Sequence, residues 1–390
     1  MGLNARCRAA LAVVGLVASA TLAGCSDGGS EPPVVATGSW QDMSPAPIAG
    51  RSPAASVWTG KEMVVWGGGF CKANPCQFDN VEPLADGGAY DPVADTWRPI
   101  APGPLAARTG TAFDWSGKEL LVWGGGIGTT QVFADGAAYD PAADSWRPLP
   151  PSPLTARRAK GVWSGREFVV WGGRDIVDAK FFADGAAYDP TANSWRMLPP
   201  VELSARERVS MISTGKEVVV FGGGTSDEAF GDGAAYDPIA NSWRMLPQPP
   251  LAARFVEGNW TGKEILYWGG EDWAQVFDDG AAYDPAANRW RPLPSGAPRS
   301  RVGASHVWTG RELLIWGGTT GTFNTYLADG GAYAPDSDSW RPLPTWTGRY
   351  VGSDHWTGRE MVIWGGIVPT GAPGRAVEIK SAADGRRYVP

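Results

Sequence analysis

The sequence predicts an all-β chain folded as a seven-bladed β-propeller. This prediction rests on a motif that recurs seven times, on strand-like segments separated by Gly and Pro turns within each copy, and on incomplete ends that complement each other. An aromatic residue followed by Gly-Gly begins at Trp66, Trp123, Trp171, Phe221, Trp268, Trp316 and Trp364, about 50 residues apart. A repeat of that length indicates a propeller or a solenoid.

Each copy contains four short strand-like segments. A Ser/Thr-Gly turn precedes an apolar run such as Leu313-Leu314-Ile315-Trp316, and an Asp-Gly turn and a Tyr follow it. In six copies a Trp lies seven residues after this Tyr. Short apolar and aromatic runs bounded by Gly and Pro are typical of strands. Gly-Gly after an apolar strand, then Tyr and Trp at fixed spacing, resembles the kelch motif, which implies blades of four strands each.

The two ends of the repeat region are incomplete in complementary ways. The seventh copy stops at Tyr388-Val389-Pro390 without its Trp, while an unpaired segment with Trp40 precedes the first copy. We therefore expect the segment from Ser39 to supply the outer strand of the last blade, which would leave no open sheet edge. Residues 39–390 are predicted to form one closed domain.

The first 24 residues resemble the signal peptide of a bacterial lipoprotein precursor. Arg6 and Arg8 precede an apolar run, and the tetrad Leu22-Ala23-Gly24-Cys25 fits a lipobox. The resemblance implies lipid attachment at Cys25, with an ordinary cleaved secretion signal as the alternative. Residues 25–38 are expected to form a flexible tether. We thus expect an exported protein, lipid-anchored to the cell envelope at the outer face of the cytoplasmic membrane or at the outer membrane.

The net charge and the cysteine content limit the classes of partner and cofactor that we expect. Removing residues 1–24 leaves 32 basic and 41 acidic residues, a net charge of −9, which disfavours binding to nucleic acid. Cys71 and Cys76 lie five residues apart in an exported protein, which favours a disulfide. No His lies near them in the sequence, so we expect neither a metal site nor a cofactor.

An Arg opens the first strand of every copy and is the candidate ligand-binding set: Arg51, Arg108, Arg157, Arg206, Arg254, Arg301 and Arg349. Seven guanidinium groups around one mouth of the ring would suit a carboxylate or another anion. Because a residue repeated in every blade usually serves the blade, the alternative is that each Arg pairs with the Asp of its Asp-Gly turn. These are Asp86, Asp135, Asp184, Asp232, Asp279, Asp329 and Asp384.

Two long loops and a few polar residues set one sector apart. The spacing from Gly-Gly to Tyr is 13 to 15 residues in five copies but 22 in the first and the seventh, which are neighbours once the ring closes. Long loops on a rigid scaffold commonly carry function. The candidates for acid–base work are Asp354, His355 and Glu257, although adjacent strand residues point to opposite faces, so Asp354 cannot simply orient His355. Trp273 and Trp346 fall outside the repeat register and are candidate ligand contacts.

These observations leave three hypotheses for function. The first is a binding module that recognises a glycan, a peptide or a partner protein of the envelope through the loop face of the propeller. The second is a sugar-active enzyme of mutarotase or epimerase type, since kelch-like propellers include such enzymes; the set of two His, two Tyr and a Tyr-linked Cys that a copper radical oxidase needs fits less well. The third is a structural scaffold of the envelope. No catalytic motif stands out, so we expect the binding module.

Overall fold

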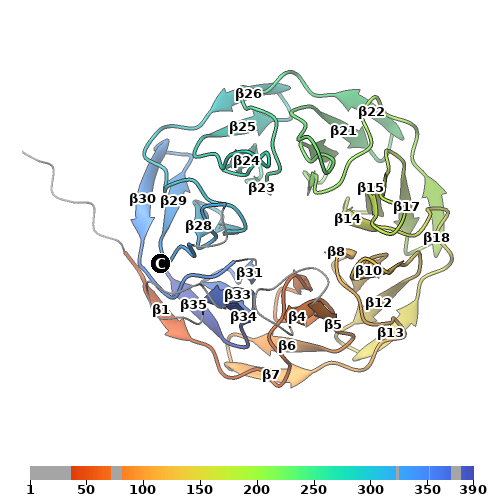
Figure 1. Cartoon of the computed structure of the whole chain (residues 1–390), viewed down its shortest axis with the longest axis horizontal. Helices are drawn as coiled ribbons and strands as arrows, with labels where there is room; N and C mark the ends of the chain where they lie inside the picture. The colour runs from red at the N-terminus through yellow and green to blue at the C-terminus, as the bar shows by residue number, and fades with distance from the viewer. Residues whose placement is uncertain (1–36, 72–80, 322–324, 351, 370–378) are drawn as a thin grey trace, which may run out of the picture. The chain divides into compact units, whose positions relative to one another are not determined.

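The computed structural model describes residues 37–71, 81–321, 325–350, 352–369 and 379–390. Every secondary-structure element in these ranges is a β-strand, and the strands form six four-stranded sheets, one five-stranded sheet and three two-stranded hairpins. The sheets form a ring in which the first strand of each blade lies innermost (Figure 1). The predicted seven-bladed all-β propeller is confirmed. The signal peptide, Cys25 and most of the tether lie outside the described residues and stay predictions.

The first four blades follow one another along the chain, each from its innermost to its outermost strand. Blade 1 consists of β2 (Ala55–Trp58), β3 (Met63–Trp66), β6 (Gly87–Asp91) and β7 (Thr96–Pro99). Blade 2 consists of β8 (Ala112–Trp115), β9 (Leu120–Trp123), β12 (Gly136–Asp140) and β13 (Ser145–Pro148). Blade 3 consists of β14 (Arg158–Trp163), β15 (Phe168–Asp175), β17 (Gly185–Asp189) and β18 (Ser194–Met197). Blade 4 consists of β19 (Ser210–Ser213), β20 (Val218–Phe221), β21 (Gly233–Asp237) and β22 (Ser242–Met245).

The last three blades repeat this order until the final strand. Blade 5 consists of β23 (Gly258–Trp260), β24 (Ile265–Trp268), β25 (Gly280–Asp284) and β26 (Arg289–Pro292). Blade 6 consists of β27 (Ser305–Trp308), β28 (Leu313–Trp316), β29 (Gly330–Ala334) and β30 (Ser339–Leu343). Blade 7 consists of β31 (Ser353–Trp356), β32 (Met361–Trp364), β35 (Gly385–Val389) and, outermost, β1 (Ser39–Asp42).

Short hairpins extend the connection between the second and third strands in four blades. They are β4 (Gly69–Cys71) with β5 (Val81–Pro83), β10 (Gly126–Ile127) with β11 (Gln131–Val132), β16 (Lys180–Phe181) on β15, and β33 (Ile367–Pro369) with β34 (Ile379–Ser381). Isolated bridges join the start of an inner strand to this connection, for example Thr109 to Gly126 and Tyr350 to Ile367. Both therefore lie on one face, which we call the loop face.

The N-terminal strand closes the ring as predicted. β1 pairs antiparallel with β35, and Trp40 lies opposite Tyr388. The Trp40 indole N–H donates to the Pro344 carbonyl oxygen at 2.9 Å, and its ring lies 5.0 Å from that of Trp316 in blade 6. The inner strands of neighbouring blades also contact one another around the whole circle, including β2 with β31. Both ends of the chain are thus held in the same blade.

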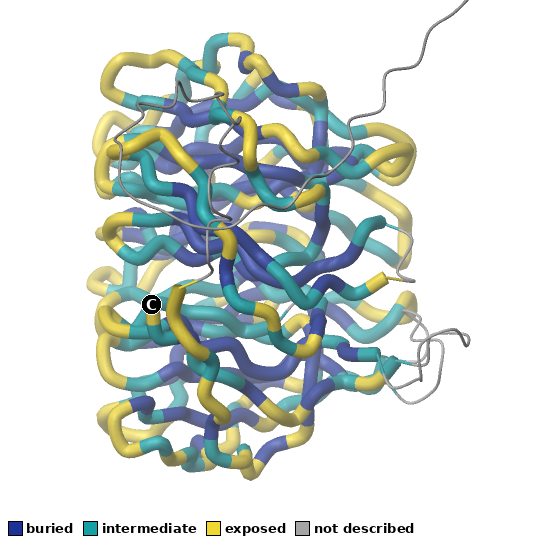
Figure 2. The backbone as a smooth tube through the Cα atoms, turned by 90° about the vertical axis from the view of Figure 1, so that its left-hand side faces the viewer, coloured by how far each residue is buried: buried dark blue, intermediate teal, exposed yellow. Residues whose placement is uncertain are grey.

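The hydrophobic core is divided into seven clusters, one between each pair of adjacent blades. In each, the aromatic residue before Gly-Gly packs against the outer-strand Trp of the next blade, as Trp66 does against Trp146 at 5.5 Å between ring centroids. Trp364 and Trp97 make this contact across the closure between blades 7 and 1, at 5.2 Å. Figure 2 shows the buried backbone running through the middle of the blades and the exposed backbone at the turns.

Close backbone approach explains the second Gly of the Gly-Gly pair. Gly68 has a φ of +77°, a conformation that side-chain-bearing residues rarely adopt. A Cβ at this position would collide with the Pro53 carbonyl oxygen. The Gly68 N–H donates instead to the Arg108 carbonyl oxygen of the next blade at 3.1 Å. The motif is therefore a requirement of the contact between blades.

Trp40→Ala should weaken the closure of the ring. Loss of a packed indole typically costs about 3 kcal/mol, and here an inter-blade hydrogen bond is lost as well. We expect a decrease of this size in the free energy of unfolding, measured by urea denaturation. Val93→Ala is the control, because Val93 is 84% exposed and should change the stability by less than ~0.5 kcal/mol. Equal effects of the two substitutions would contradict the role of β1.

Candidate functional site

The seven repeated Arg residues are buried, with 0–2% of each residue exposed. Each pairs with the Asp of its own Asp-Gly turn at N–O distances from 2.6 to 3.3 Å. Each also donates from Nη1 to the carbonyl oxygen of the first Gly of its Gly-Gly pair. These contacts match the alternative given in the sequence analysis, in which each Arg pairs with its Asp and stabilises its own blade.

A role of these Arg residues in ligand binding stays a prediction, and two of them deserve the test first. Arg51 Nη2 and Arg349 Nε are buried without a hydrogen-bond partner in the part of the chain that the structure describes. Both belong to blades 1 and 7. In five blades the guanidinium also lies over an aromatic ring, as Arg206 does over Phe230 at 4.3 Å and Arg349 over Trp346 at 3.9 Å.

The two long connections lie side by side on the loop face. Strand β4 contacts β34, and the Cys71 N–H donates to Ser381 Oγ at 3.1 Å. Residues from the first and seventh repeats therefore form one sector, which we call the double-hairpin sector. Cys71 ends β4, whereas Cys76 lies outside the described residues. The disulfide between them stays a prediction.

The three acid–base candidates make separate contacts. Asp354 Oδ2 accepts the backbone N–H of His306 in blade 6 at 3.1 Å, whereas His355 Nε2 lies 2.7 Å from Ser56 Oγ in blade 1. The two adjacent side chains thus reach opposite neighbours, as strand alternation requires. Glu257 pairs with Lys160 at 3.0 Å. Asp354 and His355 connect blades, and a catalytic role for any of the three is untested.

Burial shifts the pKa values of these groups strongly. It raises the pKa of Asp354 to about 7, assisted by the charge of Glu257. It lowers the pKa of both His306 and His355 to about 4, because the charged imidazolium loses its hydration. The two His side chains are therefore neutral at neutral pH, and Asp354 changes its charge there.

The two Trp residues outside the repeat register differ in exposure. Trp346 is half-buried, and its ring is stacked on that of Trp316 at 5.2 Å between centroids. Trp273 is 51% exposed, has a φ of +74°, and meets Phe255 edge to face at 4.8 Å. Arg208, which also has a positive φ, lies 4.9 Å from the Trp273 ring and forms an ion pair with Glu271 at 2.7 Å. Trp273 therefore remains a candidate contact on the loop face.

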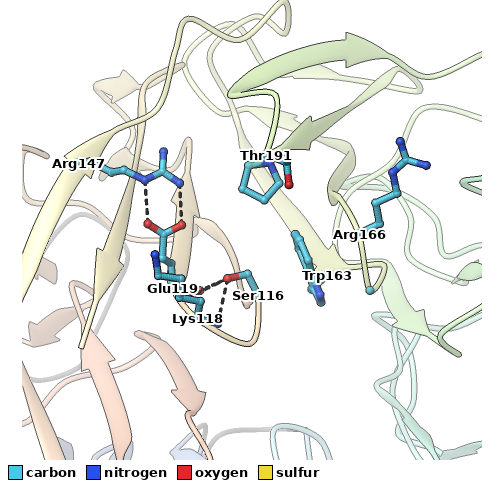
Figure 3. A pocket seen from close by; sticks show the side chains of 9 residues that line it. Ser116, Lys118, Glu119, Arg147, Trp163, Arg166 and Thr191 are labelled. Atoms are coloured by element: carbon cyan, nitrogen blue, oxygen red, sulfur yellow. Dashed lines mark hydrogen bonds and ion pairs between the residues drawn. The ribbon is translucent and has the colours of Figure 1, made fainter. Parts of the chain in front are cut away.

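Two of the hollows belong to the repeat itself. One lies between blades 2 and 3, holds about 490 Å³ and is lined by Lys118, Trp163 and Arg166, beside the paired Arg147 and Glu119 (Figure 3). The other lies between blades 5 and 6, holds about 470 Å³ and is lined by the same repeat positions. Such hollows recur with the architecture and single out no site.

A third hollow, of about 430 Å³, lies among the inner strands of blades 2 to 6. Its lining includes Asp114, Lys160, Ser213 and Glu257. Sequence reasoning missed this group except for Glu257. The available signal was the comparison of inner strands blade by blade, in which Lys160 and Ser213 depart from the other copies.

The described ranges contain no candidate metal site and no candidate membrane-spanning helix. Within the described ranges, no three His, Cys, Asp or Glu side chains are grouped so that they could hold a metal ion. Within the same ranges, no helix is long and apolar enough to cross a membrane.

The comparison with protein families agrees with the geometry. The model described as the KLHDC2/KLHL20/DRC7 Kelch-repeats domain matches residues 110–297, which contain blades 2 to 5. The comparison with curated proteins gave no match. Together with the seven sheets, the match supports a propeller of kelch-type repeats.

Arg206→Ala tests whether a repeated Arg serves its blade. Removing one partner of a buried ion pair typically costs about 3 kcal/mol or more, because the groups left behind stay desolvated. We expect a loss of this order in the free energy of unfolding, measured by urea denaturation. Asp232→Asn should cost less, since that carboxylate is 46% exposed. An unchanged stability of Arg206→Ala would leave anion binding as the better explanation of the repeated Arg.

Asp354→Asn tests the pH dependence of stability. The unfolded chain releases this proton near pH 4, whereas the folded chain holds it to about pH 7, so Asp354 lowers the stability increasingly from pH 4 to 7 and by a constant amount above. His306 and His355 act in the opposite direction, because their folded pKa is depressed and their contribution is lost as the pH falls from 6.5 to 4.

We therefore expect the Asn variant to gain stability relative to the wild type between pH 5 and 8, by at least ~1 kcal/mol. The measurement is urea unfolding at both pH values. Val93→Ala, at an exposed position without a titratable group, is the control and should show a difference that does not vary with pH. A pH-independent difference for Asp354→Asn as well would refute the raised pKa.

Proposed function

We propose that this seven-bladed propeller of kelch-type repeats is a lipid-anchored binding module displayed outside the cytoplasmic membrane, and that it recognises a partner protein through the double-hairpin sector. The observation that carries the proposal is the contact between β4 and β34. It joins the two longest connections of the chain on one face. Protein binding on that face is also what the kelch resemblance implies.

The scaffold beneath this sector suits a binding surface. Hairpin β4–β5 continues from β3 and hairpin β33–β34 from β32, and both of these second strands are fully buried. Rigid strands beneath a binding surface limit the conformational entropy that is lost when a partner binds.

The contacts favour a binding module over a sugar-active enzyme. A mutarotase-type site needs a guanidinium open to an acidic sugar and a nearby acid–base group. Arg301 and Arg349 are ion-paired with Asp329 and Asp384, while Asp354 and His355 connect adjacent blades. A glycan or a peptide bound in the double-hairpin sector is the remaining alternative ligand.

Shortening the two hairpins tests the sector. Residues 70–82 and 368–380 are each replaced by Thr225-Ser226-Asp227-Glu228, the connection of blade 4, because Gly224 bridges Ala229 as Gly69 pairs with Pro83. Cross-linking of the full-length protein in intact cells, quantified by mass spectrometry, should show partner proteins lost from the shortened variant.

A matched control keeps the fold and changes the opposite face. Val93 and Ile239 lie in turns between third and fourth strands and are 84% and 85% exposed, so Val93→Ser with Ile239→Ser should retain the partners. The same cross-linked proteins in all three chains would exclude the sector as the binding site. An envelope glycan whose binding is lost with the hairpins would keep the sector and change the ligand class.

Cys25→Ser tests the anchor separately. Acyl chains contribute about 0.8 kcal/mol per buried methylene, so a lipidated Cys25 should hold the protein in the membrane fraction after high-salt and alkaline washes. We expect the variant to appear in the soluble fraction. Identical fractionation of the two proteins would exclude lipid anchoring at Cys25 and leave the proposal for the hairpins intact.

A further inference from the structure

The seven blades serve as an internal reference for one another. A residue shared by all copies serves the blade, whereas a departure at an aligned position needs an explanation of its own. The strand registers align the inner strands: Trp58 lies opposite Met63, Trp115 opposite Leu120, and Ser213 opposite Val218. Six inner strands end in Trp at this position, and β19 in blade 4 ends in Ser213. Blade 4 thus lacks one large side chain at the end of its inner strand.

A second departure lies three residues before this position. Five of the inner strands carry a small residue there: Ala55, Ala112, Ser210, Ser305 and Ser353. The other two carry Lys160 in blade 3 and Glu257 in blade 5, the blades on either side of blade 4. Lys160 Nζ lies 3.0 Å from Glu257 Oε1, and the two side chains are 44% and 57% exposed. The only charged residues at this repeat position thus form a pair across blade 4.

These departures converge on the hollow of about 430 Å³ among blades 2 to 6, because Lys160, Ser213 and Glu257 all line it. Its apolar lining is provided mainly by Phe113, Met211, Ile212, Trp260 and Trp308. Polar and apolar residues line it in about equal number. A hollow of several hundred Å³ that combines apolar and aromatic walls with placed polar groups can hold a small molecule. Unlike the hollows between blades 2 and 3 and between blades 5 and 6, it follows from residues that break the repeat.

The polar groups of the hollow are available to a ligand. An exposed ion pair contributes only about 0–1 kcal/mol to stability. Lys160 and Glu257 can therefore separate and each pair with a charge of the ligand at little cost in free energy. Asn259 Nδ2 is buried and has no hydrogen-bond partner in the described ranges. Asp114 accepts the backbone N–H groups of Trp115 and Trp163, and burial raises its pKa to about 6. The hollow thus offers a cation, an anion and an unused donor beside aromatic walls.

We infer that this hollow binds a small zwitterion with an apolar or aromatic body, namely a free α-amino acid or a dipeptide. Its carboxylate pairs with Lys160 and accepts from Asn259, its ammonium pairs with Glu257, and its side chain packs on Met211 and the Trp rings in the space where blade 4 has no Trp. A purely anionic ligand would face the repulsion of Glu257, and a purely cationic one that of Lys160. The site is separate from the double-hairpin sector and does not depend on the proposed partner.

Isothermal titration calorimetry of the purified full-length protein tests the inference. The probes are phenylalanine, tryptophan, leucine and the dipeptide Phe-Ala, compared with phenethylamine and 3-phenylpropionate, which each lack one charge, and with glucose. We expect saturable binding of at least one zwitterion and at least tenfold weaker binding of both single-charge analogues. If no zwitterion binds up to millimolar concentration, or if an analogue binds as tightly as its zwitterion, the inference is overturned.

Variants that restore the repeat locate the site. Ser213→Trp introduces the residue of the six other blades and should abolish binding by filling the hollow. Lys160→Ala combined with Glu257→Ser introduces the small residues of the other blades and should weaken binding at least tenfold, which covers the case in which the Trp variant does not fold. Lys216→Ala removes an exposed Lys outside the hollow and should leave the affinity unchanged. Wild-type affinity in a folded Ser213→Trp variant or in the double variant would refute the site.

Discussion

The structure depends on one contact that is repeated around the ring, the one between an Arg and two Gly-Gly pairs. The Arg108 guanidinium donates to the Gly124 carbonyl oxygen of its own blade, while the Arg108 carbonyl oxygen accepts from the Gly68 N–H of the preceding blade. A buried charge is tolerated only with close partners, and Asp135 supplies the opposite charge at 2.6 Å. One residue thus fixes the loop face of its own blade and the position of its neighbour.

The closing blade shows how far this repetition extends. Elsewhere an outer-strand Arg pairs with the Glu of the first turn, as Arg98 does with Glu62 at 2.9 Å. Strand β1 carries Gln41 at that position, and Arg387 on the adjacent strand β35 provides the guanidinium to Glu360 at 3.7 Å. Arg387 also donates to Gln41 Oε1. A strand from the other end of the chain can therefore complete the blade, because the third strand supplies the missing charge.

A functional site is best sought where the blades differ, because the residues that all blades share serve the fold of each blade. One difference is the double-hairpin sector of blades 1 and 7, which enlarges the loop face on one side. The other is the charged pair and the missing Trp around blade 4, inside the ring. The two lie in different blades and in different surroundings, one on a face and one among the inner strands. We propose a folded protein as the partner of the first and a small molecule as the ligand of the second.

The sequence by itself determined the strands, the number of blades and the closure, because Gly-Gly, Tyr and Trp recur at fixed spacing. Each of these residues is needed locally, the Gly for its backbone conformation and the aromatic residues for packing between blades. It also indicated that the two long connections would be neighbours, which follows from ring closure alone. Only the tertiary structure decided the environment of individual side chains. Whether Arg206 meets Asp232 or solvent, and which neighbour Asp354 and His355 reach, depends on distances between segments that the sequence does not specify. The pair of Lys160 and Glu257 joins residues 97 positions apart, and only the curvature of the ring brings them together.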